Sequence, residues 1–303
     1  AEHRMALRIR RSITVGEGVR TGAQNAAYTV NPFGPRRTGQ RRPTGASATP
    51  SPSWSIPAKP GVLAPPLERE FFMGLEELNR GEPQLALERF ESAARRDIRD
   101  RALSDDLLAG LTAVHVGDVA RAIPHLEAVV TSDAGLPDPL LVKYAPELAF
   151  EVSITPEVSA LIPAGSMAAA LALVECYQDV GRHEEAVGVL QQLVDVDGDP
   201  ALTLSLCELY AEVGDWDEVA ALGEEIANED DLSLQIVLYR ATAMLRRGED
   251  EEAVQAYDDA LASSQRSPGL LTAAHLGRGC TLMRLGRTAE AREDLARLLD
   301  DDG

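Results

Sequence analysis

The stretch RRGEDEEAVQAYDDAL, residues 246–261, contains a pattern that returns along the chain. A glycine is followed by acidic or polar residues, by an alanine five positions on and by a tyrosine nine positions on. Related stretches begin at residues 81, 117, 181, 214 and 286, as GEPQLALERF, GDVARAIPHL, GRHEEAVGVL, GDWDEVAALG and GRTAEAREDL. Self-similarity at a spacing of about 20–50 residues marks repeat architectures, so this recurrence decides the fold class.

When the copies are aligned on the glycine, small residues fall where two helices would cross. Seven residues before the glycine stand Gly74, Gly110, Val174, Cys207, Ala241 and Gly279. Five residues after it stand Ala86, Ala122, Ala186, Val219, Ala253 and Ala291. Antiparallel helices joined by a tight turn approach closely only where their facing residues are small. We therefore expect helix pairs in which the glycine ends the first helix in a left-handed conformation and an acidic or polar residue starts the second.

This pattern resembles the tetratricopeptide repeat, whose motif has a small residue in the first helix, Gly at the turn, then Ala, an aromatic residue and Ala. Successive turn glycines are 36, 64, 33, 34 and 38 residues apart, against a family period of about 34. The resemblance covers six copies over about 67–303 and implies an all-α fold, a right-handed α-solenoid of antiparallel helix pairs. Two residues depart from the motif. Gly223 should loosen the fourth copy, and Pro124 is tolerable only in the first turn of its helix.

The 64-residue step leaves 131–165 as either a degenerate repeat or an insertion. Five prolines in LPDPLLVKYAPELAFEVSITPEVSALIPAG (136–165) prevent two full helices, although 139–150 could hold one. Phe150, Val152 and Ile154 alternate with polar residues, which is compatible with a short extended piece. We favour the degenerate helix pair, because a break in stacking would expose the apolar faces of two half-solenoids.

Residues 1–66 form a separate region by composition. They hold ten Lys or Arg and two acids, a net +8, whereas the rest of the chain holds 19 basic and 47 acidic residues, a net −28. The region is rich in Pro, Gly and Ser, so we expect a mostly disordered basic arm and linker. ALRIRRSITVGEGVR (6–20) could form a short hairpin. It resembles the first strands of a small β-rich bacterial domain of unknown function, over about fifteen residues, and implies no chemistry.

No pattern in the sequence indicates catalysis. The histidines stand singly, at His3, His115, His125, His183 and His275. Nucleotide-binding and nucleophile motifs are absent from the sequence, and the acidic pairs Glu184-Glu185 and Glu251-Glu252 suit the positive ends of helices. We therefore expect no enzyme activity, no cofactor and no metal.

Cysteine usage and hydropathy bear on the compartment. Cys176, Cys207 and Cys280 are odd in number and form no CxxC motif, so we expect small buried residues in a reducing environment. No run of eighteen apolar residues occurs, and the N-terminus lacks a signal-peptide core. These features predict a cytoplasmic protein without a transmembrane segment.

The resemblance implies a concave groove, lined by the first helices, that holds extended peptides or partner helices. Its positions lie ten, six, three and two residues before each turn glycine. They are Phe71, Leu75, Leu78 and Asn79; Leu107, Leu111, Val114 and His115; Leu171, Glu175, Gln178 and Asp179; Leu204, Glu208, Ala211 and Glu212; Leu238, Thr242, Leu245 and Arg246; and Leu276, Cys280, Met283 and Arg284. The predicted peptide-binding set is Phe71, Leu75, Leu78, Leu111, Val114, Glu175, Asp179, Glu208, Glu212, Leu245, Arg246, Met283 and Arg284. The alternatives are that the leucines only pack neighbouring helices and that the acidic residues form an ordinary solvated face.

Family members that bind chaperone tails clamp a carboxylate with Lys and Asn. Here those places hold Phe71, Leu75, Leu108, Ala168 and Ala172. The sequence therefore disfavours a carboxylate-clamp co-chaperone.

Two functions follow from these observations. The first is a non-catalytic interaction scaffold or adaptor that binds a peptide or helix of a partner protein in the groove. The second is a nucleic-acid- or anionic-surface-associated protein that uses the basic arm. A body at −28 would repel phosphate, which disfavours nucleic acid. WSIPAKPGVLAPPL (54–67) could also dock in the first groove of its own chain or remain a free linker.

Overall fold

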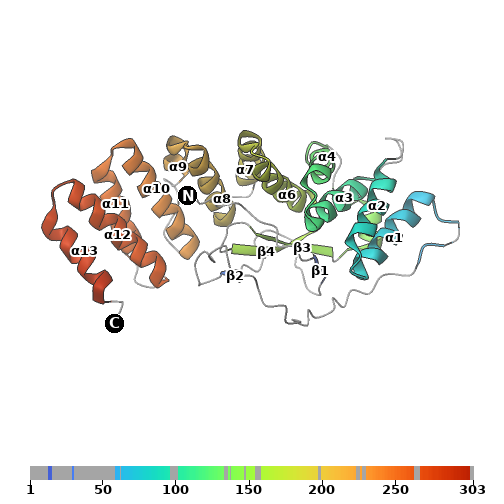
Figure 1. Ribbon diagram of the computed structural model, residues 1–303, viewed down its shortest axis with the longest axis horizontal. Helices are drawn as coiled ribbons and strands as arrows, with labels where there is room; N and C mark the ends of the chain where they lie inside the picture. Colours follow the sequence, from blue (N-terminus) through green and yellow to red (C-terminus); the bar gives the residue numbers. More distant parts are fainter. Residues whose placement is uncertain are drawn as a thin grey trace. The chain divides into compact units, whose positions relative to one another are not determined.

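The computed structural model describes residues 13–15, 29–30, 59–61, 63–95, 102–132, 136, 138–146, 148–153, 158–196, 199–222, 226, 230–262 and 267–300 (Figure 1). The described chain divides between Leu193 and Val194 into two compact units. We refer to them as the N-terminal unit and the C-terminal unit. The predicted arm lies outside the described residues, except for 13–15, 29–30, 59–61 and 63–66.

The N-terminal unit is a stack of helix pairs with one interruption. Its helices are α1 (Pro66–Asn79), α2 (Pro83–Ala94), α3 (Leu103–Val116), α4 (Val119–Val130), α5 (Pro139–Tyr144), α6 (Ser166–Asp179) and α7 (His183–Val196), the last of which runs into the boundary. Within pairs, α1 packs on α2 and α3 on α4; between pairs, α2 contacts α3 and α4 contacts α6. The stack therefore continues from α4 to α6 although 35 residues, 131–165, separate them in sequence.

The C-terminal unit repeats the same arrangement without an interruption. Its helices are α8 (Pro200–Val213), α9 (Trp216–Leu222), α10 (Asp231–Arg247), α11 (Asp250–Leu261), α12 (Pro268–Arg284) and α13 (Thr288–Asp300). Consecutive helices pack antiparallel in pairs, and α10 also contacts α8 and α12. The described part of α9 extends to Leu222, and Gly223, which was expected to loosen the fourth copy, lies outside the described residues. All-α stacking of helix pairs is thus confirmed in both units.

Glycine forms the turn in all six copies. Each turn glycine has a positive φ, between 76° and 85°, and no other residue type has one in the described parts of the chain. Gly117, Gly214 and Gly248 end α3, α8 and α10 in the left-handed conformation. A side chain with a Cβ is strained there, so the backbone requirement explains why this position is always glycine.

The predicted close crossings are also present. A Cβ on Gly74 would lie 2.5 Å from the Phe90 ring, and one on Gly110 would lie 2.6 Å from Leu126. In both cases the facing residue stands nine positions after the turn glycine of the same copy. The alanine column at five residues after the turn is fully or almost fully buried throughout: Ala86, Ala122, Ala186, Val219, Ala253 and Ala291. The recurring motif is therefore a packing pattern.

The 131–165 segment is an insertion and not the degenerate helix pair that we favoured. It holds the six-residue helix α5 and the strands β3 (Leu148–Ser153) and β4 (Val158–Pro163), which pair antiparallel with Phe150 opposite Ile162. Prolines that flank α5 and the strands confine α5 to two turns. The expectation failed because the repeats stack across the insertion, so no helix pair is needed to bridge α4 and α6.

Two strands from the beginning of the chain extend the hairpin. β1 (Ile13–Val15) pairs with β3 and β2 (Thr29–Val30) pairs with β4, which gives the antiparallel order β1-β3-β4-β2. The hairpin suggested for 6–20 has only Ile13–Val15 among the described residues, and this strand pairs with β3.

Two single-residue expectations were wrong. Pro124 is the sixth residue of α4 and not in its first turn. Both Pro124 and Ala120, whose carbonyl loses its helical donor, are exposed, so water can bind that carbonyl. Cys280 is exposed, whereas Cys176 and Cys207 are buried as expected. Burial raises the pKa of both buried thiols to about 12.

Candidate partner-binding surface

In the N-terminal unit, the predicted groove positions mostly lie inside the protein. Phe71 and Leu75 of α1 are fully buried, and so are Leu107 of α3 and Leu171 of α6. Leu111 and Val114 are buried too, and Leu78 is partly buried. Buried side chains offer no surface to a peptide, so this part of the predicted groove is corrected to core.

The insertion is what covers α1. Tyr144, at the end of α5, packs its ring edge-on against Phe72, with centroids 5.4 Å apart, and 6.5 Å from the ring of Phe71. Its hydroxyl and the ammonium of Lys143 both donate to Glu68 of α1. An element that follows α4 in sequence thus covers the first helix of the stack.

Asp138 fixes the start of this covering element. Its Oδ1 accepts from the backbone N–H groups of Leu140 and Leu141, at 3.1 and 3.0 Å, which caps α5. Its Oδ2 accepts from the backbone N–H of Ser104, at 2.9 Å, at the start of α3. One carboxylate therefore joins the insertion to a repeat helix.

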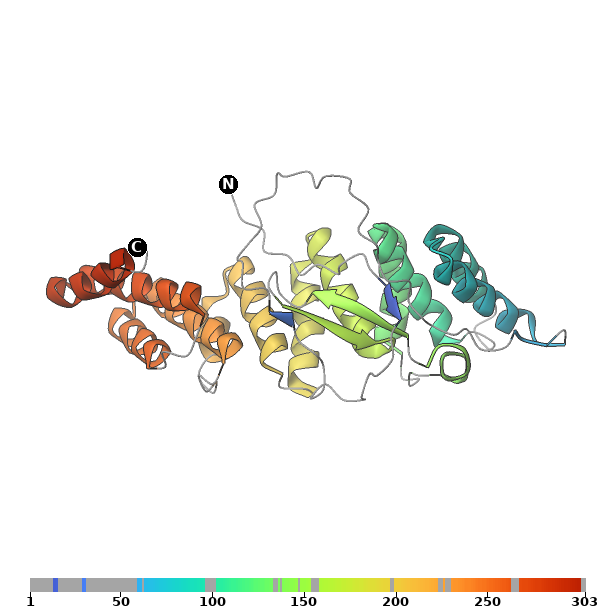
Figure 2. The same cartoon turned by 90° about the horizontal axis from the view of Figure 1, so that it is seen from below.

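The hairpin covers the third copy. β3 and β4 both contact α6 (Figure 2). Leu148, Ala149 and Phe150 of β3 are all buried. Every residue of α6 from Ala168 to Tyr177 is buried, as is every residue of α3 from Ser104 to Val114. A helix that is buried all round has no open face, so α3 and α6 present no groove.

The four predicted acidic residues are unequal in exposure. Glu175 on α6 is buried and Glu208 on α8 is partly buried. Asp179 and Glu212 are exposed at the ends of those helices. Asp179 and Glu212 belong to different units, so each contributes charge to its own unit.

In the C-terminal unit, the groove positions of α10 and α12 reach the surface, whereas Leu204 of α8 is fully buried. Leu238 and Leu245 of α10 pack against the hydrophobic cluster that α10, α11 and α12 form together, but both stay partly exposed. In α12, Leu276 is 48% exposed and Met283 is 55% exposed, and Cys280 between them is exposed. Their spacing of four and three residues places them on one side of the helix. We call Leu276, Cys280 and Met283 the α12 stripe.

Two arginines of the predicted set stand beside these apolar residues. The guanidinium of Arg246 lies 5.3 Å from the centre of the Trp216 ring. Arg284 pairs with Asp250 at 2.9 Å. Both arginines are exposed at the turn end of their helices, so they add positive charge where α10 and α12 end.

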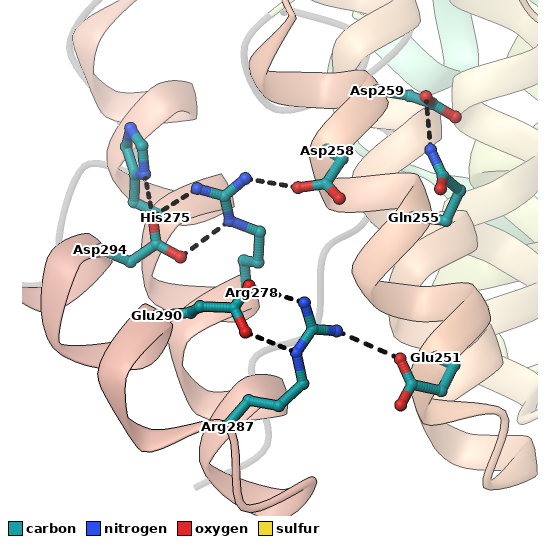
Figure 3. Close-up of polar contacts among 9 residues, drawn as sticks. All are labelled: Glu251, Gln255, Asp258, Asp259, His275, Arg278, Arg287, Glu290 and Asp294. Atoms are coloured by element: carbon teal, nitrogen blue, oxygen red, sulfur yellow. Dashed lines mark hydrogen bonds and ion pairs between the residues drawn. The ribbon is translucent and has the colours of Figure 1, made fainter.

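An ion-pair network joins α11, α12 and α13 (Figure 3). Asp294 accepts from Arg278, at 2.6 and 2.8 Å, and lies 2.9 Å from Nδ1 of His275. Burial alone would raise the pKa of Asp294, but the bonds from Arg278 and His275 outweigh burial and lower it. Arg278 also reaches Asp258 of α11, while Arg287 joins Glu290 to Glu251. The network ties the sixth copy to the fifth.

The sequence contains a recurring pair of positions that indicates such contacts. His275 and Asp294 stand eleven residues before and eight after the turn glycine. The same two positions hold Asp106 and His125, 2.8 Å apart, in the second copy. In the first copy they hold Glu70 and Arg89, 3.2 Å apart. Each pair crosses from one helix of a copy to the other, which identifies it as a structural contact.

Residues 54–67 were expected either to dock in the first groove or to remain a free linker, and part of this segment is described. Leu63 is 98% exposed. Lys59 pairs with Glu76 of α1 at 3.1 Å. Leu63 is therefore not buried in the first groove, and Trp54, Ile56 and Val62 lie outside the described residues.

The described residues contain no group of three or more His, Cys, Asp or Glu side chains placed to hold a metal ion. They also contain no helix of the length and apolarity needed to cross a membrane. The five places of a carboxylate clamp, Phe71, Leu75, Leu108, Ala168 and Ala172, are all fully buried.

A family model described as tetratricopeptide repeat matches residues 169–204, which span α6, α7 and the start of α8. These residues form a tetratricopeptide repeat, and helix pairs stack in the same way in both units. Proteins that contain this repeat are generally non-catalytic interaction scaffolds.

The chain is similar to several solved structures over much of its length. The structure of Naa15/Naa10 bound to HypK-THB is 15% identical, covers 78% of this chain and 32% of the matched chain, and has a TM-score of 0.50. MamA AMB-1 is 17% identical over 67% of this chain and 99% of its own, with a TM-score of 0.41. A tetratricopeptide repeat protein from Parabacteroides merdae ATCC 43184 is 13% identical over 77% and 79%, with a TM-score of 0.44. No curated protein matches the sequence.

Proposed function

We propose that this protein is an interaction scaffold that binds an apolar segment of a partner protein on the inner side of its C-terminal unit. The binding surface consists of the α12 stripe together with Leu238 and Leu245 of α10. One observation supports this choice above the others. The groove position ten residues before the turn glycine is fully buried in α1, α3, α6 and α8, partly exposed in α10, and 48% exposed at Leu276 in α12.

The side chains of this surface define the kind of segment that fits. Leucine and methionine side chains at helical spacing bind the apolar face of an amphipathic helix or the alternate side chains of an extended peptide. Methionine adapts its shape to different apolar partners. Arg246 and Arg284 at the turn end favour a segment that carries acidic residues at its matching end.

The test uses the full chain as bait and then measures affinity for the captured segment. The double variant Leu276→Asp, Met283→Asp should weaken binding by about tenfold or more, because burying a carboxylate against an apolar ligand is unfavourable. Leu85→Asp is the matched control, since Leu85 is a similarly exposed leucine, at 47%, on α2.

The control should bind as the wild type does. If the double variant retains full affinity, or if Leu85→Asp loses as much, the partner does not bind on the α12 stripe. Circular dichroism of each variant establishes that the helices are intact.

A further inference from the structure

The inner side of α1 contains an aromatic and acidic site that is already filled. Phe71 and Phe72 form its apolar wall, and Glu68, one turn earlier, forms its polar rim. The Tyr144 ring is 1% exposed and lies against both phenylalanines. The site thus encloses one phenol side chain almost completely.

Glu68 accepts hydrogen bonds from two residues of the segment 138–144, which fills the site. Its Oε1 accepts from the Tyr144 hydroxyl and also from the Lys143 ammonium. These two bonds, from Lys143 first and then from Tyr144, lower the pKa of the Glu68 carboxyl below its ordinary value. A cation and a phenol on adjacent residues are therefore what this carboxylate binds.

Contacts with the rest of the N-terminal unit stabilise residues 138–144, the segment that fills this site, more than their own helix propensity does. An isolated helix shorter than about 12 residues is marginal in water, and α5 has six residues. Leu141 and Tyr144 face the unit and are buried, whereas Val142 and Lys143 are exposed, at 55% and 59%. The segment therefore docks by one side, with the Asp138 cap at its start and the Tyr144 anchor at its end.

We propose that Glu68, Phe71 and Phe72 form a binding site for a lysine–tyrosine pair on a short helix, and that the chain's own residues 138–144 occupy it in cis. A partner segment with an aromatic phenol preceded by a basic residue then competes with α5 for the site. This site belongs to the N-terminal unit and does not depend on the function proposed for the C-terminal unit.

The experiment supplies the segment in trans. The probe is a fluorescently labelled peptide of residues 138–146, DPLLVKYAP, added to the full chain and followed by fluorescence anisotropy. The variant Tyr144→Ala removes the anchor from the site, so it should bind the peptide at least about tenfold more tightly than the wild type, whose site is occupied. The same peptide with Tyr144→Ala should not bind either protein.

Two further variants keep the proposal open to refutation. If Tyr144→Ala fails to fold, Lys143→Glu replaces it, because this exposed residue then repels Glu68 and loosens α5. Adding Glu68→Gln to the loosened protein should weaken peptide binding severalfold, since the cation loses its carboxylate. Equal binding to wild type and loosened protein, or no binding to a folded loosened protein, would mean that α5 only seals the core.

Discussion

Helices α3 and α12 hold the same place in their repeats but differ in what surrounds them. In α3 every residue from Ser104 to Val114 is buried, whereas α12 buries only Ala274, Gly279, Thr281 and Leu282. Each helix is followed by a turn glycine and has a glycine where it crosses its second helix, with an added Cβ lying 2.6 Å from Leu126 at Gly110 and 3.3 Å from Leu295 at Gly279. The repeat motif therefore determines how a pair folds, and elements outside the motif determine which faces of the pair meet solvent.

The insertion illustrates this separation in the N-terminal unit. α5 and the β3–β4 hairpin lie between copies in sequence, yet they contact α1 and α6. They cover parts of α1 and α6, while α12 in the C-terminal unit keeps exposed apolar side chains. Four measurements test this contrast.

The largest effect should come from placing a charge at equivalent positions of the two units. Leu107→Asp buries a carboxylate at a fully buried site and should lower the free energy of unfolding by more than about 4 kcal/mol. Leu276→Asp, at a position 48% exposed, should lower it by less than about 1 kcal/mol. Urea unfolding followed by circular dichroism measures both. Similar losses would show that the inner faces of the two units do not differ.

A bulky residue at the helix crossing should have an intermediate effect in both units. Ala253→Trp and Ala122→Trp each overfill a fully buried crossing and should lower the free energy of unfolding by about 1–3 kcal/mol. The control is Ala289→Trp on the exposed side of α13, which should change stability little. An unchanged melting temperature for Ala253→Trp would contradict the packing assigned to the fifth copy.

Replacing a turn glycine should lower the stability of its unit by a smaller amount. The control substitution, at a glycine inside a helix, should raise stability. Gly248 has a φ of 82°, so Gly248→Ala should destabilise the C-terminal unit by about 1–2 kcal/mol. Gly188 lies within α7, and a Cβ there meets no atom within 4 Å. Gly188→Ala should therefore stabilise the N-terminal unit by about 0.5–1 kcal/mol. Calorimetric melting temperatures that shift in the same direction would refute this account of the turn.

Lowering the pH should have the smallest effect on the free energy of unfolding, and the pKa of Asp294 determines the direction of this effect. The bonds from Arg278 and His275 hold the pKa of Asp294 below its ordinary value of 3.8, against the effect of burial. A group with a lowered folded pKa contributes stability above its unfolded pKa and loses it as the pH falls through the folded value. The free energy of unfolding of the C-terminal unit should thus fall below about pH 4. Asp294→Asn should show a shallower decline in acid; an identical decline would mean that this pair carries no pH dependence.

The features that could be predicted from the sequence are those that depend on neighbours within one copy. Gly74 against Phe90 is such a feature, because the two residues lie in consecutive helices joined by the three residues 80–82. The contact of Phe71 with Tyr144 was not predictable in this way, since the α3–α4 pair separates Tyr144 from the first copy in sequence. The prolines of 136–165 correctly indicated that long helices were absent there, but no local rule indicates where a short helix will dock. Cys280 was misjudged for the same reason: its burial depends on an element outside its copy.

The bond from Tyr144 to Glu68 has a consequence for the order of folding. It spans 76 residues, whereas the cross-helix pairs within copies span 19. Repeat arrays with only near-neighbour contacts can begin to fold at any copy and extend from there, and chains with long-range contacts fold more slowly because a larger loop must close first. The C-terminal unit can therefore gain its helix pairs one after another, while the N-terminal unit reaches its native state only when α1, α3 and α5 have all formed and met.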